Sequence, residues 1–246
     1  FLCHRAALFY LNTIKQGTRG NEVVARTAIL KRIRDVRKRH EKNDSSNSKY
    51  KLENCITNLI PSRGKLDQSG RVGLFISEAR KVNTTISKVN SIELVPNEIG
   101  AYLKKQNLAP VIKASGILKE LPWKSTLLDI KIGVASSSDE VGVTQAYAGI
   151  AETGTLVFYS GEKTPTSLNF LPPTNIAIVY SHKIFGSYED IWKDIRKNVG
   201  ESSSMLVPRT INLITGPSRT ADIEQTLLLG VHGPKRLHVV IVENEF

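Results

Sequence analysis

The sequence predicts an α/β protein with a mostly parallel sheet that helices cover on both faces. Short apolar runs, such as residues 175–180 and 237–242, alternate with segments of helical periodicity. Strands that are buried on both faces are apolar along their whole length, which is typical of parallel sheets. The chain has 246 residues, of which 40% are hydrophobic, and this is enough to bury a sizeable core.

A basic amphipathic helix is expected over residues 23–42. Apolar residues recur there at helical spacing, and Lys and Arg lie mostly on the other side. Such a helix can bind a membrane surface or an acidic partner. The simpler interpretation is an ordinary docking helix with a solvated basic face.

The rest of the chain alternates helices and strands. Pro96 suits the first turn of a helix, where its missing N–H costs little. Ser187 and Asp190 have the spacing of a capping box. The expected helices span 74–83, 97–107, 142–152, 187–198 and 221–230, and the expected strands span 91–96, 110–115, 130–136, 154–160, 175–180, 211–215 and 237–242.

The positive charge is concentrated near the start of the chain. The formal net charge is +11, and residues 1–49 hold twelve Lys and Arg against four Asp and Glu. A nearly neutral body with a basic arm differs from a protein that steers nucleic acid into a basic groove. We therefore expect no nucleic-acid partner.

The two cysteines, Cys3 and Cys55, are too few and too far apart for an iron–sulfur cluster or a structural zinc site. No metal site is expected in the chain. No apolar run is long enough to span a bilayer, and the start lacks the apolar core of a signal peptide. The sequence predicts a cytoplasmic protein, although the acid-poor residues 1–20 also resemble a weak targeting segment.

The segment "ITGPSRTADIEQTLLLGVHGP" is the first candidate binding site. A buried strand is expected to end at Gly216 and Pro217, and a helix to begin near Ala221 after a Ser218 or Thr220 cap. The free N–H groups of that helix start, the hydroxyls and the Arg219 guanidinium would then form an anion pocket at the carboxyl end of a strand. The predicted ligand-binding residues here are Gly216, Pro217, Ser218, Arg219, Thr220, Asp222 and Glu224.

A structural explanation of the same residues stays open. Ser218 and Thr220 would only cap the helix, and Arg219 would pair with Asp222 or Glu224. His232 follows in a turn between glycines, where an imidazole can act as a general base or ligand. A lone histidine in a turn is more often structural.

The segment "GVTQAYAGIAETGTLVFYSG" is the second candidate. Gly154 is expected to end a helix in the left-handed conformation, so that Glu152, Thr153 and Thr155 lie at a helix-to-strand junction. A partly buried Glu152 carboxylate could act as nucleophile or base. A structural ion pair with Lys or Arg explains it as well. Nothing has the spacing of a dinucleotide-binding loop, a P-loop or a serine nucleophile elbow.

These segments, with "TPTSLNFLPP" and "MLVPRTINLITGPSRTADIEQTLLLGVHGPKRLHVVIV", closely resemble the lactate utilization protein C family of LUD domain proteins. The resemblance implies a fold like the sugar-phosphate isomerase and CoA-transferase (NagB/RpiA-like) group. It divides the chain into an N-terminal extension (1–22), the basic helix (23–42) and a single LUD-type domain (43–246).

The resemblance also implies a function. Members act with two iron–sulfur proteins in oxidising L-lactate to pyruvate, so the clusters are expected in partner subunits and no cofactor in this chain. A carboxylate or phosphate ligand is expected at the GPSRT loop, with Thr153, Gly154 and Thr155 as further ligand-binding residues. The alternatives are a stand-alone enzyme like CoA transferases or sugar-phosphate isomerases, with Glu152 as nucleophile or base, and a non-catalytic module that senses a small acid.

Overall fold

The computed structural model describes residues 27–28, 30–32, 34–35, 61–201, 208–221 and 227–244. The chain divides into two units, Phe1–Asn58 and Leu59–Phe246. In the first unit the described residues are helical and exposed, and they lie within the range 23–42 where a basic helix is predicted.

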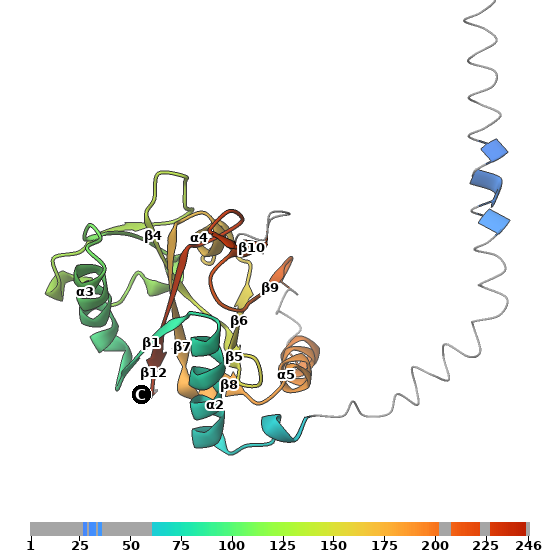
Figure 1. The fold of residues 1–246 in the computed structure, drawn as a ribbon, viewed down its shortest axis with the longest axis horizontal. Coiled ribbons are helices and arrows are strands. Elements are labelled where there is room, and N and C mark those ends of the chain that lie inside the picture. The colour runs from blue at the N-terminus through green and yellow to red at the C-terminus, as the bar shows by residue number, and fades with distance from the viewer. Residues whose placement is uncertain are drawn as a thin grey trace, which may run out of the picture. The chain divides into compact units, whose positions relative to one another are not determined.

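A six-stranded, fully parallel sheet forms the centre of the second unit (Figure 1). Its strand order is β1-β12-β7-β4-β2-β3. The strands are β1 (Thr85–Val89), β2 (Val111–Ala114), β3 (Asp129–Ile132), β4 (Val141–Gln145), β7 (Thr174–Tyr180) and β12 (Arg236–Val242).

Helices α2 (Gln68–Lys81) and α3 (Val95–Lys105) cover opposite faces of the sheet (Figure 1). Successive side chains of a strand point to opposite faces. In β7, Ile176 and Ile178 accordingly join the core beneath α3, whereas Ala177 and Val179 join the core beneath α2. The predicted α/β class, with a parallel sheet between helices, is confirmed.

A second sheet, with strand order β8-β5-β6-β9, packs on the α2 side. It was not predicted. Its strands are β5 (Ala148–Ile150), β6 (Thr155–Tyr159), β8 (Ile184–Phe185) and β9 (Ile211–Ile214), and α5 (Tyr188–Glu201) packs on it through Ile191 and Ile195. Strand β9 is half-exposed at the edge of this sheet, so the expectation of a buried strand there was wrong.

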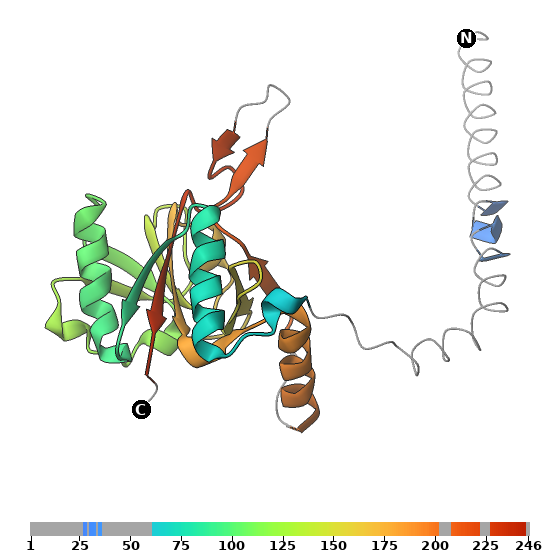
Figure 2. The same ribbon diagram turned by 60° about the horizontal axis from the view of Figure 1, so that its bottom comes forward.

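The remaining elements are short. Strands β10 (Arg219–Ala221) and β11 (Leu227–Leu229) form an antiparallel pair, which stands off the sheets in Figure 2. Helix α4 (Ser167–Phe170) contacts β4. The 3₁₀ helices are Ser62–Gly64, Ile92–Leu94, Gly116–Leu118, Trp123–Ser125 and Ser181–Lys183.

Three predicted elements were wrong. Residues 142–152 form β4 and β5 instead of a helix, and residues 221–230 belong to the β10–β11 pair where they are described. The strand expected over 91–96 is a 3₁₀ turn leading into α3, and the edge strand is β1, a few residues earlier. For residues 142–152, pairing with the distant strands β2, β7 and β8 outweighed the local pattern.

Both predicted helix starts are confirmed. Pro96 lies in the first turn of α3. The Ser187 hydroxyl accepts a hydrogen bond from the Asp190 amide at 3.3 Å, and the Asp190 carboxylate accepts one from the Ser187 amide at 3.1 Å. This reciprocal pair is a capping box, with Asp in the place of the usual Glu.

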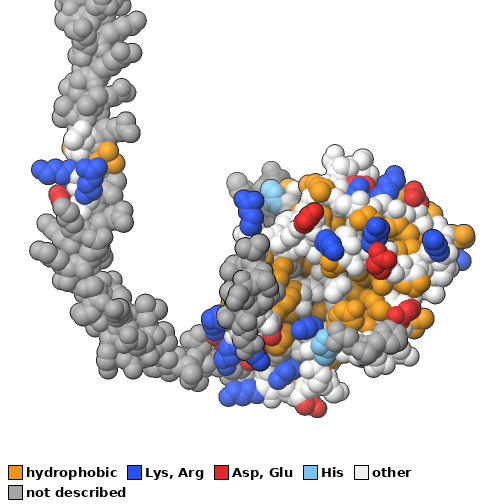
Figure 3. Space-filling model, turned by 180° about the vertical axis from the view of Figure 1, so that it is seen from behind, with side chains coloured by type: hydrophobic (Ala, Val, Ile, Leu, Met, Phe, Trp, Pro, Cys, Tyr) orange, Lys and Arg blue, Asp and Glu red, His pale blue; other side chains and the backbone are white. Residues whose placement is uncertain are grey.

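On the face of this unit shown in Figure 3, Lys and Arg side chains are scattered among acidic and hydrophobic ones and do not form one patch. In the described part of the chain no helix is both long enough and apolar enough to cross a membrane. Likewise, no cluster of three or more His, Cys, Asp or Glu within the described ranges is placed to hold a metal ion. Cys3 and Cys55 lie outside those ranges.

Candidate functional site

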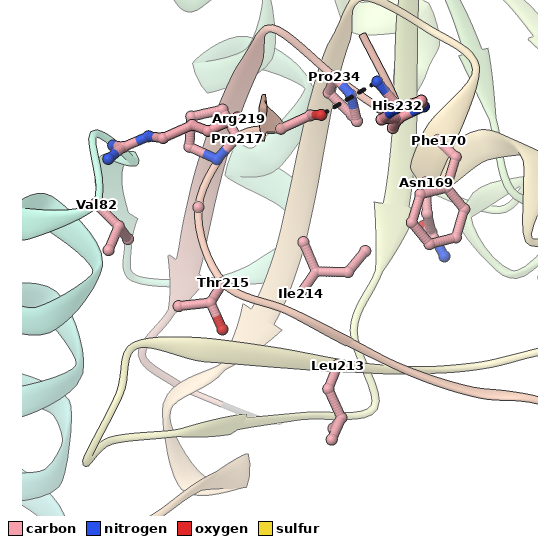
Figure 4. Close-up of a pocket in the computed structure, with 13 residues that line it drawn as sticks. Val82, Asn169, Phe170, Leu213, Ile214, Thr215, Pro217, Arg219, His232 and Pro234 are labelled. Atoms are coloured by element: carbon pink, nitrogen blue, oxygen red, sulfur yellow. Dashed lines mark hydrogen bonds between the residues drawn. The ribbon is translucent and has the colours of Figure 1, made fainter. Parts of the chain in front are cut away.

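A cavity of about 440 Å³ lies between two loops that the sequence analysis singled out (Figure 4). One is the Gly216–Arg219 turn, and the other is the His232–Pro234 turn. We call this cavity the loop pocket. It is also lined by Val82, Asn169, Phe170, Leu213, Ile214 and Thr215.

Ser218 ties the two loops together. Its amide donates to the Pro234 carbonyl at 2.9 Å, and its carbonyl accepts from the Gly230 amide at 3.0 Å. Its hydroxyl is 3.4 Å from the His232 amide, the hydrogen bond drawn in Figure 4. The Ser218 amide is therefore occupied and is not free to bind an anion.

Gly216 sets the path of the first loop. Its φ is +73°, a conformation that glycine adopts readily and other residues adopt rarely. A Cβ there would lie 2.7 Å from the Val82 carbonyl oxygen, just after α2. The loop can approach α2 this closely because no side chain is present.

The helix expected from Ala221 is absent, because Arg219–Ala221 pairs with Leu227–Leu229 as β10 and β11. The predicted helix dipole and its free amides therefore make no contribution to an anion site, and Thr220 caps no helix but lies half-buried in β10. Asp222 and Glu224 fall outside the described residues.

Arg219 lies at the rim of the loop pocket, and its side chain is exposed. Within the described residues, no carboxylate lies within ion-pair distance of its guanidinium. Figure 4 shows this side chain extending toward Val82 and away from His232, whose ring is also exposed. The pocket is open at this corner, and no described carboxylate neutralises the cation.

The loop pocket lies at the amino end of the parallel sheet. Val82, Phe170 and Pro234 precede β1, β7 and β12 respectively. The sequence placed the anion pocket at the carboxyl end of a strand. This is true only relative to β9, which ends at Ile214 in the second sheet. The site is thus built between the two sheets.

Glu152 lies in the turn between β5 and β6, because the helix expected to end there is absent. Its side chain is 7% exposed, and its Oε1 accepts a hydrogen bond from the Tyr188 amide, the first residue of α5, at 3.0 Å. It is not among the residues that line the loop pocket. Its contact is that of a helix cap, and a catalytic role stays a prediction.

We expect Glu152→Ala to lower the free energy of unfolding by about 1–2 kcal/mol, the usual cost of losing a helix cap. The substitution leaves the amide at the start of α5 without its acceptor. Urea unfolding of the full chain measures this, with Glu120→Ala, at an exposed position, as the matched control. Equal stability of the two variants would contradict the capping role.

Thr153 and Thr155 belong to a cluster of hydroxyls next to the loop pocket. Thr155 Oγ1 is 2.7 Å from Thr153 Oγ1 and 2.7 Å from Thr215 Oγ1, and it is 3.0 Å from the Tyr188 hydroxyl. Only Thr215 of this group lines the pocket. The cluster therefore connects the β5–β6 turn to the pocket wall without reaching the cavity itself.

A second polar site, missed by the sequence analysis, surrounds His238 in β12. Its ring stacks on Tyr102 with centroids 4.0 Å apart. Nδ1 is 2.9 Å from Thr85 Oγ1, and Nε2 is 3.2 Å from Ser87 Oγ. Burial, with a smaller contribution from Lys105, lowers the pKa of His238 to about 4. Its position inside an apolar run gave no signal of these partners.

Sequence reasoning also missed Asn169 and Phe170, which bring α4 to the loop pocket. They lie within the segment "TPTSLNFLPP", whose resemblance to relatives was noted, but nothing in its spacing indicated a site. Their place depends on α4 packing against β4, far away in the sequence.

This chain is similar to known proteins in sequence and in fold. The model of the LUD domain family matches residues 48–242. "Lactate utilization protein C" of Bacillus subtilis (strain 168) is 39% identical over 104 residues, 42% of each chain. "Lactate utilization protein C" of Geobacillus sp. (strain WCH70) is 34% identical over 129 residues, 49% of this chain and 53% of the relative.

The chain thus spans about half the length of the curated relatives it matches. Among solved structures, a DUF162 family protein from Deinococcus radiodurans is similar in fold, with a TM-score of 0.54 and 20% identity over 72% of this chain and 99% of the other. The resemblance of the sequence motifs to this family is confirmed, because the family model matches residues 48–242, which is most of the chain. The chain belongs to the LUD domain family.

Proposed function

We propose that this chain serves in lactate utilization, as a cluster-free subunit of a cytoplasmic system that oxidises L-lactate to pyruvate. The names of its relatives support the process. Two iron–sulfur lactate utilization proteins would hold the clusters, since this chain has only two cysteines, Cys3 and Cys55. The cytoplasm keeps such thiols reduced.

Within this system the chain would bind a small carboxylate or phosphate in the loop pocket. The observation that carries the proposal is the exposed Arg219 guanidinium, at the rim of a cavity of about 440 Å³, with no carboxylate partner among the described residues. A guanidinium offers a planar fork of N–H donors that matches a carboxylate or phosphate. Small-molecule sites are cavities of this size with a few polar groups.

Arg219 supplies the charge, and the Ser218 hydroxyl and the exposed His232 ring would supply hydrogen-bond contacts elsewhere along the pocket wall. Thr220, Asp222 and Glu224 follow Arg219 in the chain and complete the predicted set of ligand-binding residues in this segment. Thr153 and Thr155 would support the wall of the loop pocket through Thr215, whose hydroxyl is hydrogen-bonded to that of Thr155. Gly154, Gly216 and Pro217 would shape the loops.

We expect Arg219→Ala to weaken binding of L-lactate or phosphate at least tenfold, because a hydrogen bond to a charged group contributes about 1.5–3 kcal/mol. Stability should change little, since an exposed arginine contributes little to folding. Isothermal titration calorimetry of the full chain tests this. Arg196→Ala, which removes an exposed arginine from α5, is the matched control. Equal affinity of both variants would remove the basis for an anion site.

The role as a subunit is tested by co-purification. A tagged full chain, expressed from its native locus in cells grown on lactate, should bring down two iron–sulfur proteins, and its deletion should stop growth on L-lactate. A monomer that brings down neither protein, with unchanged growth after deletion, would contradict the proposal.

A further inference from the structure

Three buried polar side chains without hydrogen-bond partners face one small compartment. Ser115, Thr144 and Asn169 have exposed fractions of 0%, 4% and 5%. Within the described structure, Ser115 Oγ, Thr144 Oγ1 and Asn169 Oδ1 have no partner, and all three residues line the same cavity. Leaving one such group unpaired costs about 1–3 kcal/mol, so folded proteins nearly always supply a partner. Three together indicate a partner that the described part of the protein does not provide.

The position of this cluster in the sheet points to a ligand. Strand β2 lies between β3 and β4. The chain passes from β2 to β3 on one side, and then continues from β4 through β7 to β12 on the other side. In open α/β sheets, ligands bind beside the carboxyl ends of the two strands where this direction reverses. Ser115 directly follows β2, and Thr144 is the last residue but one of β4.

The compartment is small and neutral. The compartment has a volume of about 10 Å³, which is room for one oxygen atom with its hydrogens. Gln145, Tyr159 and Thr164 complete its polar lining, and no described residue that lines it is charged. A hydroxyl oxygen, which both donates and accepts, suits two hydroxyls and an amide oxygen better than an ion does.

Two features relate the compartment to its surroundings. Thr164 and Pro165 form part of its wall, and the Gly116 amide holds this segment through a 2.8 Å hydrogen bond to the Lys163 carbonyl. Asn169 lines both this compartment and the loop pocket. The two cavities therefore share one wall.

We propose that Ser115, Thr144 and Asn169 form a binding site for one hydroxyl oxygen at the switch point of the sheet. The oxygen belongs either to a water molecule or to the alcohol group of a small ligand. The second source rests on the proposed function, whereas the site itself does not.

The site is tested in the ligand-free full chain by whether the Thr144→Val substitution lowers or raises the melting temperature. Thr144→Val replaces the hydroxyl by a methyl of the same shape. If an oxygen is bound there, the variant loses one of its partners, and the melting temperature should fall by about 3 °C. If the compartment is dry, the variant removes an unpaired polar atom, and the melting temperature should rise.

Thr84→Val is the matched control, because Thr84 Oγ1 is also buried without a described partner but lines none of the cavities discussed above. We expect Thr84→Val to raise the melting temperature. Thr144→Val behaving in the same way as Thr84→Val would overturn the proposal. This outcome does not depend on whether lactate binds.

Titration with L-lactate and with propionate, which lacks only the 2-hydroxyl, then identifies the source of the oxygen. If the ligand provides it, wild type should prefer L-lactate about tenfold and Thr144→Val should lose that preference. If a water provides it, Thr144→Val should leave both affinities unchanged while the melting temperature still falls. If neither L-lactate nor propionate binds, the result counts against the proposed function and leaves the melting test of the site intact.

Discussion

Replacing Gly154 by alanine is expected to lower the free energy of unfolding by about 3 kcal/mol or more. Gly154 has φ of +63° in the buried turn between β5 and β6. A Cβ there would lie 2.7 Å from the Ala79 Cα and 2.9 Å from the Glu78 carbonyl carbon, both backbone atoms of α2. Because neither the turn nor the helix can give way cheaply, strain and overpacking add together. The turn and α2 would have to separate.

Urea unfolding of the full chain measures this effect. Gly73→Ala is the matched control, since Gly73 is exposed within α2 and a Cβ there meets nothing within 4 Å. Alanine should stabilise that position by up to about 1 kcal/mol. A Gly154→Ala variant as stable as Gly73→Ala would show that α2 and the β5–β6 turn are not in contact as described.

The second large effect is a loss of stability in acid caused by His238. Its pKa is about 4 in the folded protein, below the ordinary value of 6.5, because burial disfavours the charged ring. Between these values the unfolded chain binds a proton that the folded chain does not. The contribution is therefore fully present above about pH 6.5 and is lost as pH falls toward 4, and it amounts to about 3 kcal/mol.

The stability of wild type and His238→Gln, measured by urea unfolding from pH 7 to 5, tests this. Wild type should lose stability steeply over this range, and His238→Gln should have a flatter profile whatever its absolute stability. Carboxylates titrate mostly below this range. His182→Gln, at an exposed position, should keep the wild-type slope. Parallel profiles for wild type and His238→Gln would show that the ring is not buried neutral.

The parallel sheet was largely predictable, because burial on both faces leaves apolar runs such as 175–180 and 237–242 that local reading detects. Residues 142–152 were wrongly predicted to be a helix, because their small side chains are also compatible with close helix packing. In the structure the small residues admit neighbouring layers instead. A Cβ on Gly142 would lie 2.7 Å from the Leu168 carbonyl oxygen, and one on Gly149 would lie 3.1 Å from the Phe75 ring. The likeness to the sugar-phosphate isomerase group stays a prediction.

The candidate site was predictable only where its parts are close in sequence. The turns at Gly216–Arg219 and His232–Pro234 meet because a short antiparallel pair, β10 and β11, brings the chain back. That pairing depends on strand register, which periodicity does not reveal. Asn169 and Val82 reach the same cavity from other elements, and only the packed fold brings them there.

A crystal structure of the full chain grown with L-lactate tests the central claim most directly. The account predicts lactate in the loop pocket, between the Gly216–Arg219 and His232–Pro234 turns, with its carboxylate bound by the Arg219 guanidinium. Lactate bound elsewhere, or an empty loop pocket at a lactate concentration that saturates the protein in calorimetry, would contradict it.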